Sequence, residues 1–111
     1  MDRQTKTIQL VGTESGAVKF DLSAFSVNGK TPTKFMILGA KWVCHGGGVH
    51  VFFDRSSPLT AMVLSGVGEW REPKIVDSGS GGTGDIQFSS LAGPTGVAPG
   101  YMIEMSVQAV V

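Results

Sequence analysis

Apolar and polar residues alternate with a period of two along much of this chain, and no other feature restricts its fold as strongly. The alternation recurs in five segments, at residues 8–10, 18–22, 49–53, 86–88 and 101–111. Successive side chains of a β-strand point to opposite faces, so this period is typical of strands with one buried face. No apolar stripe with helical spacing competes with it. The sequence therefore predicts an all-β protein.

Turn-forming residues divide the alternating pattern into eight or nine short strands. We expect them roughly at residues 5–11, 17–26, 34–45, 48–54, 59–65, 68–71, 84–91 and 100–111, with a ninth at 74–77. Glycine clusters such as Gly46-Gly47-Gly48 supply the turn chemistry between strands. A chain of 111 residues can bury one core between two sheets and is too short for a second. The prediction is a single antiparallel β-sandwich domain over residues 1–111, with residues 1–6 as an N-terminal arm.

The expected core comes from the apolar positions of these strands. Residues 34–45 are apolar on both parities, which indicates a central strand covered on both sides or lying near a subunit contact. The last strand is apolar on one face and polar on the other, the pattern of a sheet with one solvated side. We expect six side chains to be buried between the two sheets: Phe20, Leu38, Trp42, Phe53, Phe88 and Ile103.

The charge and cysteine content excludes several classes of partner and environment. Nine basic and nine acidic residues cancel, and no basic run stands out. This argues against nucleic acid or an anionic membrane as a partner. The single cysteine, Cys44, cannot form an internal disulfide, and its apolar surroundings indicate a buried, inert thiol. No segment reads as a signal peptide or a membrane span, so we expect a soluble protein made in a cytoplasm.

Two glycine-rich motifs match known catalytic or nucleotide-binding signatures, but neither has the context that the signature requires. The string His45-Gly46-Gly47-Gly48 occurs at the oxyanion hole of some esterases, yet the chain has no G-x-S-x-G element. Residues 79–84 satisfy G-x-G-x-x-G, yet a strand is expected to follow them where a helix is needed. We therefore expect a hairpin turn at the first motif, a flexible loop at the second, and no enzymatic activity.

Two histidines are the best candidates for a metal site. His45 and His50 flank the expected hairpin turn, which would place them near each other, with Cys44 and Asp54 in the neighbourhood. Because Cys44 and His45 point to opposite faces of one strand, at most two or three ligands can converge. The sequence predicts no metal site and no cofactor.

The densest cluster of functional groups is Glu69-Trp70-Arg71-Glu72-Pro73. A glycosidase holds its two carboxylates roughly 5 to 10 Å apart across a cleft, and two acids this close on a proline-ended strand are not evidently such a pair. Such a cluster is commonly a solvated strand end with one aromatic ring folded over it. An exposed Trp70 beside Arg71 would instead be an interface anchor, because both residue types are enriched at binding hot spots.

The order of several segments along the chain carries more information than any single motif. They are the N-terminal strand that ends at Gly12, the apolar strand near residues 34–44, and residues 66–71, 81–84, 85–90 and 100–105. Together these segments resemble the small head-decoration, or cement, proteins of tailed bacteriophages. The strongest part is the turn and strand over residues 82–86 together with the terminal strand, about the last third of the chain.

The resemblance implies a jelly-roll-like β-sandwich that adds to the outside of an assembled capsid and clamps junctions between major capsid protein subunits. The expected partners are the major capsid protein and neighbouring copies of the decoration protein itself. The expected location is the outer capsid surface of the virion. Elimination from the predicted core leaves six candidate contact residues: Asp2, Arg3, Lys6, Glu69, Trp70 and Arg71.

An alternative function is a carbohydrate- or receptor-binding module of a phage tail or surface assembly. In that case Trp70 or Tyr101 would serve as a stacking platform. Such a site would need a second exposed aromatic ring beside the first and a polar pocket.

Overall fold

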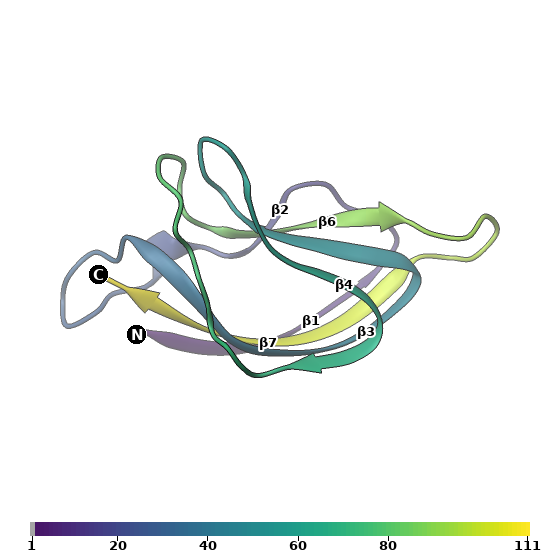
Figure 1. Cartoon of the computed structure of the whole chain (residues 1–111), viewed down its shortest axis with the longest axis horizontal. Coiled ribbons are helices and arrows are strands. Elements are labelled where there is room, and N and C mark those ends of the chain that lie inside the picture. The colour runs from purple at the N-terminus through teal and green to yellow at the C-terminus, as the bar shows by residue number, and fades with distance from the viewer. Residues whose placement is uncertain (1) are drawn as a thin grey trace.

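The computed structural model describes residues 2–111, and those residues form an all-β structure (Figure 1). The strands are β1 (Arg3–Val11), β2 (Ala17–Phe20), β3 (Lys34–Phe53), β4 (Leu59–Trp70), β5 (Ile75–Val76), β6 (Ile86–Ala92) and β7 (Gly100–Val110). The described chain contains no α-helix, only the short 3-10 helix η1 (Leu22–Ala24). Every pairing between strands is antiparallel. The predicted all-β, antiparallel class is therefore confirmed.

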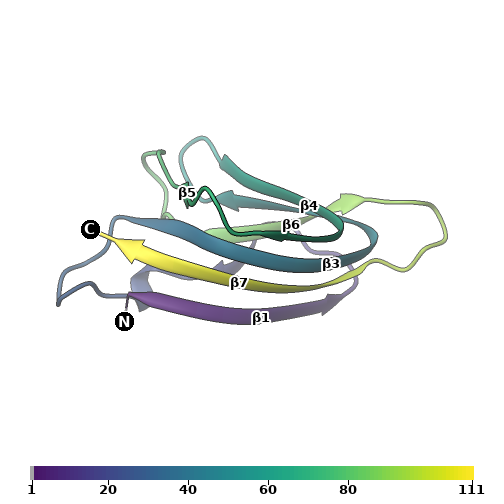
Figure 2. The ribbon, with the colours of Figure 1, turned by 60° about the horizontal axis from the view of Figure 1, so that its bottom comes forward.

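The strands form four long rows that run side by side: β1 with β2, β7 with β6, β3 alone, and β4 with β5. β7 pairs with the first part of β3, and β6 pairs with its last part. β4 and β5 follow the other edge of β3, while β1 and β2 extend the sheet beyond β7 and β6. All four rows bend back near their middle, so the sheet curls into a half-barrel (Figures 1 and 2).

The half-barrel has two layers. We call "lower layer" the part made of β1, β7, residues 34–45 of β3 and residues 67–70 of β4, which lies at the bottom of Figure 1. The "upper layer" consists of β2, β6 and the remaining parts of β3 and β4. Both belong to one continuous sheet, because β3 and β4 run through the bend.

The bend depends on glycine. In β3, Gly46 and Gly47 have φ angles of 70° and 142°, which other residues rarely adopt. A Cβ atom on Gly46 would lie 2.5 Å from the carbonyl oxygen of Ala98. The hairpin turn expected at residues 46–48 is therefore wrong. These glycines bend a strand that stays paired with β4 before and after the bend, so β3 continues where a turn would have ended it.

A β-bulge explains why residues 34–45 are apolar on both parities. The register between β3 and β7 shifts between Ile37 and Gly39. Odd-numbered residues up to Ile37 therefore face the core, whereas even-numbered residues face it from Ala40 to the bend. The strand is central in the sheet, as expected, but its outer face is not covered, since Val43 is exposed there. β3 is one continuous strand where two were expected, at residues 34–45 and 48–54, and β4 likewise replaces those expected at 59–65 and 68–71. The structure therefore has seven strands in place of the expected eight or nine.

The expected strand over residues 17–26 is shorter than predicted. β2 ends at Phe20, and the side chain of Asp21 accepts a hydrogen bond of 2.9 Å from the backbone N–H of Ser23. This cap starts η1, because the carboxylate satisfies a donor that the 3-10 turn leaves free.

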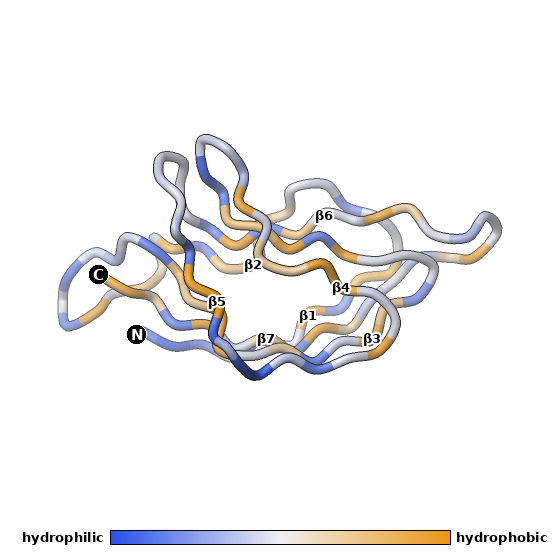
Figure 3. The backbone as a smooth tube through the Cα atoms, in the orientation of Figure 1, coloured by the Kyte–Doolittle hydropathy of each residue, from blue (hydrophilic) through white to orange (hydrophobic). Residues whose placement is uncertain are grey.

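The hydrophobic core lies between the two layers. Figure 3 shows hydrophobic segments along the strands of both layers, while the two connections at the top are pale or blue. Four of the six predicted core side chains are fully buried, namely Phe20, Phe53, Phe88 and Ile103. Leu38 and Trp42 are only half-buried. The bulge removes Leu38 from the inward parity, and Trp42 lies at the margin of the core, where its Nε1 donates to the Ser65 carbonyl at 3.1 Å.

The glycine-rich loop at residues 78–84 is held by side chains, in contrast to the flexible loop expected there. Arg55 Nε donates to Asp77 Oδ2 at 2.7 Å, and its Nη1 donates to the Gly81 carbonyl at 3.0 Å. The loop also approaches the chain closely, since a Cβ atom on Gly82 would lie 2.4 Å from the Asp54 carbonyl oxygen. Glycine is therefore needed here for close packing as well as for turning.

Candidate functional site

The outer face of the lower layer carries two neighbouring rows of side chains across the sheet. Residues that pair directly between strands point to the same face, so the register defines these rows. The first row contains Glu69, Lys41, Glu104 and Thr7, in the order β4, β3, β7, β1. The second contains Val67, Val43, Met102 and Gln9 in the same order. A charged row and an apolar row thus lie side by side on one exposed face.

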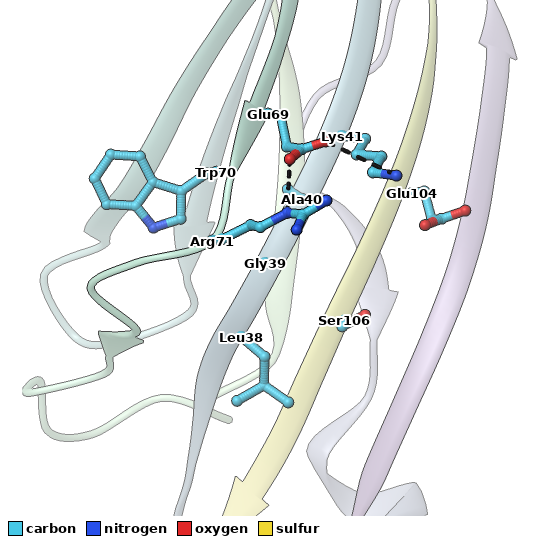
Figure 4. Close-up of a pocket in the computed structure, with 9 residues that line it drawn as sticks. All are labelled: Leu38, Gly39, Ala40, Lys41, Glu69, Trp70, Arg71, Glu104 and Ser106. Carbon is cyan, nitrogen blue, oxygen red and sulfur yellow. Dashed lines mark ion pairs between the residues drawn. The ribbon is translucent and has the colours of Figure 1, made fainter.

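The charged row borders a hollow of about 310 Å³ (Figure 4). Arg71 Nε lies 2.6 Å from Glu69 Oε1, and Lys41 Nζ lies 3.8 Å from Glu69 Oε2. The hollow forms over Gly39, where a Cβ atom would meet the Trp70 carbonyl oxygen at 3.0 Å. These ion pairs are exposed and contribute little to stability. With two cations and two anions, counting Glu104, the hollow has no net charge and offers polar groups of both signs.

The apolar row is the larger feature. Val67, Val43 and Met102 are all well exposed, and Val11 on β1 lies one step further along the same face. Their exposed fractions range from 48% for Met102 to 85% for Val11. We call these four residues the apolar band. Because contiguous exposed apolar side chains mark sites of contact with other molecules, the apolar band is the best candidate binding surface.

Trp70 does not belong to this face. It pairs with Ala40, whose side chain is buried, so it points toward the core side of the sheet. Trp70 is half-buried against the core, and its Nε1 donates to the Pro73 carbonyl at 2.9 Å. Figure 4 shows its ring directed away from Arg71 and Lys41. The expected exposed anchor is therefore wrong, because consecutive residues of a strand alternate between faces.

The candidate contacts near the N-terminus are also divided between faces. Residues 3–6 belong to β1, so the expected arm is wrong for its described part, and Met1 lies outside the described residues. Arg3 points outward opposite Gln108, and the Asp2 carbonyl accepts a bond from β7. Lys6 faces the core side. Of the six candidates, Arg3, Glu69 and Arg71 share the outer face of the lower layer.

Lys6 joins two parts of the fold. Its Nζ donates to the Lys19 carbonyl at 2.7 Å and lies 5.2 Å from the centre of the Phe20 ring. A lysine that spans from β1 to β2 in this way connects the two layers at one margin of the sheet. The role shown for Lys6 is therefore structural.

The two histidines lie five residues apart on one bent strand and do not face each other across a hairpin. His45 Nδ1 lies 3.0 Å from the Ala98 carbonyl oxygen, and His50 Nε2 lies 2.7 Å from Thr60 Oγ1. Within residues 2–111, no group of three or more His, Cys, Asp or Glu side chains is arranged to hold a metal ion.

Tyr101 is buried and belongs to the interior. Its hydroxyl donates to Glu14 Oε1 at 2.5 Å, and Lys19 Nζ donates to the other oxygen of Glu14 at 2.7 Å. Burial raises the pKa of Tyr101 above its ordinary value, and the hydrogen bond to Glu14 raises it further. Tyr101 therefore cannot serve as a surface stacking platform.

No protein-family model and no curated protein matches the chain. In the part of the chain that the structure describes, no helix has the length and apolar character needed to cross a bilayer.

Sequence reasoning missed the apolar band. Its four residues come from four different strands, and only the strand order makes them neighbours. The one available signal was the two-residue alternation along each strand. Counted from the buried residues of their strands, Val43 and Val67 fall on the outer face, where a polar residue is usual.

Proposed function

We propose that this protein is a non-enzymatic structural protein of a phage virion, which binds the outer capsid surface and stabilises the head as a decoration or cement protein. The observation that carries the proposal is the apolar band on the outer face of the lower layer. The sequence resemblance supplies the class of partner. In this proposal the curled sheet corresponds to the jelly-roll-like sandwich that the resemblance implies.

The chemistry of the face suits a protein partner. The apolar band would pack against the major capsid protein, with Glu69 and Arg71 as polar contacts beside it and Arg3 further along the same face. An apolar centre with a polar rim is the usual composition of a protein interface. One such contact is small, but copies placed on a capsid lattice act together, so high affinity at each site is not needed.

The test is cosedimentation of the purified protein with undecorated capsids of its own phage. We expect binding at a fixed copy number per capsid, a higher temperature of shell rupture, and little weakening between low and physiological salt, because the contact carries little net charge. Val43→Lys should lower the occupancy. Val18→Lys is the matched control, because Val18 is equally exposed (50% against 52%) but lies on β2, in the upper layer.

Several outcomes would refute the proposal. Capsids without bound density in electron cryomicroscopy would do so, as would equal losses of binding for Val43→Lys and Val18→Lys. Binding to a defined oligosaccharide would instead favour the carbohydrate- or receptor-binding alternative. That alternative has less support, because Trp70 is half-buried and Tyr101 is buried.

A further inference from the structure

The two central strands of the lower layer carry complementary side chains on their outer face. In the charged row Lys41 of β3 pairs with Glu104 of β7, and in the apolar row Val43 pairs with Met102. All four side chains are exposed. The pairing of β3 with β7 has no register shift over residues 39–45, so the rows are regular in this part of the sheet. Opposite charges thus lie side by side in one row, and apolar side chains in the next.

The central charges are only partly compensated within one chain. Among residues 2–111, no basic side chain forms an ion pair with Glu104. Lys41 Nζ lies 3.8 Å from Glu69, whose other carboxylate oxygen is already held by Arg71 at 2.6 Å (Figure 4). The face therefore suits a partner that presents an anion opposite Lys41 and a cation opposite Glu104.

We propose that this partner is a second copy of the chain, and that two lower layers pack face to face about a two-fold axis. The axis runs parallel to the strands, midway between β3 and β7. It exchanges β3 with β7 and β4 with β1, and it leaves each row opposite the same row of the second copy. Lys41 then lies opposite the partner's Glu104, and Glu104 opposite the partner's Lys41. One symmetry operation produces two ion pairs.

The same axis matches the apolar row. Val43 lies opposite the partner's Met102, so the centre of the contact is apolar beside the two ion pairs. An apolar centre with polar groups next to it is typical of protein interfaces. No pair in the two rows opposes like charges. The outer pairs are Glu69 with the partner's Thr7 and Val67 with the partner's Gln9.

The geometry of packed sheets permits these contacts. Two sheets that pack face to face lie about 10 Å apart, a gap that a lysine and a glutamate can span from opposite sides. Aligned sheets cross at about 30°, which leaves residues near the axis in contact. Hollows of about 520 and 430 Å³ lie on either side of Val43 and Met102, so side chains of the second copy can enter between the rows.

The size of the face sets the strength of the dimer. Four strands over residues 39–45 of β3 and their neighbours cover about 19 Å by 24 Å. Two such faces bury on the order of 1,000 Å², near the lower limit for a specific interface. We therefore expect a weak dimer that forms at micromolar concentrations and above.

The dimer does not rest on the proposed function, but both would use the apolar band. One copy cannot make the two contacts at the same time, so the dimer would be a form of the free protein that separates before capsid binding. The experiment below contains no capsids, so a failure of the proposed function would leave its result unchanged.

The experiment is sedimentation velocity over a range of protein concentrations. We expect the wild-type chain to dimerise, and Lys41→Glu or Glu104→Lys alone to raise the dimer dissociation constant by about tenfold or more, because each opposes like charges twice. An equimolar mixture of the two variants should form heterodimers, since one copy then offers two acidic groups and the other two basic groups. Lys30→Glu is the matched control, because it reverses an exposed charge in the turn before β3, off this face.

The proposal is overturned if the wild-type chain stays monomeric at every concentration, if either charge reversal dimerises like wild type, or if Lys30→Glu weakens the dimer equally. It is also overturned if the mixture of Lys41→Glu and Glu104→Lys stays monomeric while circular dichroism shows that both variants are folded.

Discussion

Replacing Arg55 by methionine should destabilise the fold strongly, because it breaks the buried ion pair with Asp77. Asp77 is 1% exposed and its Oδ2 accepts from Arg55 Nε at 2.7 Å. Its other oxygen accepts from the Gly79 backbone N–H at 2.9 Å. Methionine retains the apolar stem of the arginine but leaves the carboxylate with this one partner in a site that excludes water.

The magnitude follows from the burial of the pair. Removing one member of a buried ion pair typically costs about 3 to 5 kcal/mol, because the other charge stays buried without compensation. The guanidinium also donates to the carbonyls of Gly81 and Thr33, each at 3.0 Å, so the loop at residues 78–84 would lose one of its attachments at the same time. This loss is a large part of the roughly 5 to 15 kcal/mol by which a domain is usually stable.

The measurement is urea unfolding of the purified variant, followed by tryptophan fluorescence. Arg71→Met is the matched control, since the Arg71 and Glu69 side chains are 72% and 43% exposed and an exposed pair contributes less than about 1 kcal/mol. The double variant Arg55→Met/Asp77→Leu should recover part of the loss, because it removes the uncompensated charge. The reasoning is refuted if Arg55→Met and Arg71→Met destabilise the protein equally.

Three further predictions concern the core. Phe88→Ala should cost about 3 to 5 kcal/mol as a cavity substitution, since Phe88 is fully buried; a melting temperature near that of wild type would contradict its place in the core. The chain's one tyrosine, Tyr101, should ionise in an ultraviolet absorbance titration only well above pH 10, because its pKa is raised in the fold. The folded state then binds more protons than the unfolded state above about pH 10, so stability should fall as the pH rises beyond that value, and Tyr101→Phe should remove this contribution. Cys44 should react slowly with thiol reagents at neutral pH, since burial raises the pKa of its thiol; reaction as fast as that of a free thiol would show that the site is open.

The sequence by itself determined the class of the fold and the inward face of its most regular strand. In β7, residues Tyr101, Ile103, Met105, Val107 and Ala109 alternate in the sequence and are all buried. This success has a local cause, because the two-residue period is a property of the strand backbone and one buried face is enough to impose it.

The tertiary structure decided where the strands end and which side chains share an exposed face. Gly46 and Gly47 permit a turn or a bend equally well, and the pairing of β3 with β4 on both sides of the bend selects the bend. The bulge near Leu38 reverses the inward parity of β3, a change that no local signal specifies. The apolar band exists only through strand order, because residues far apart in the sequence become neighbours when the sheet forms.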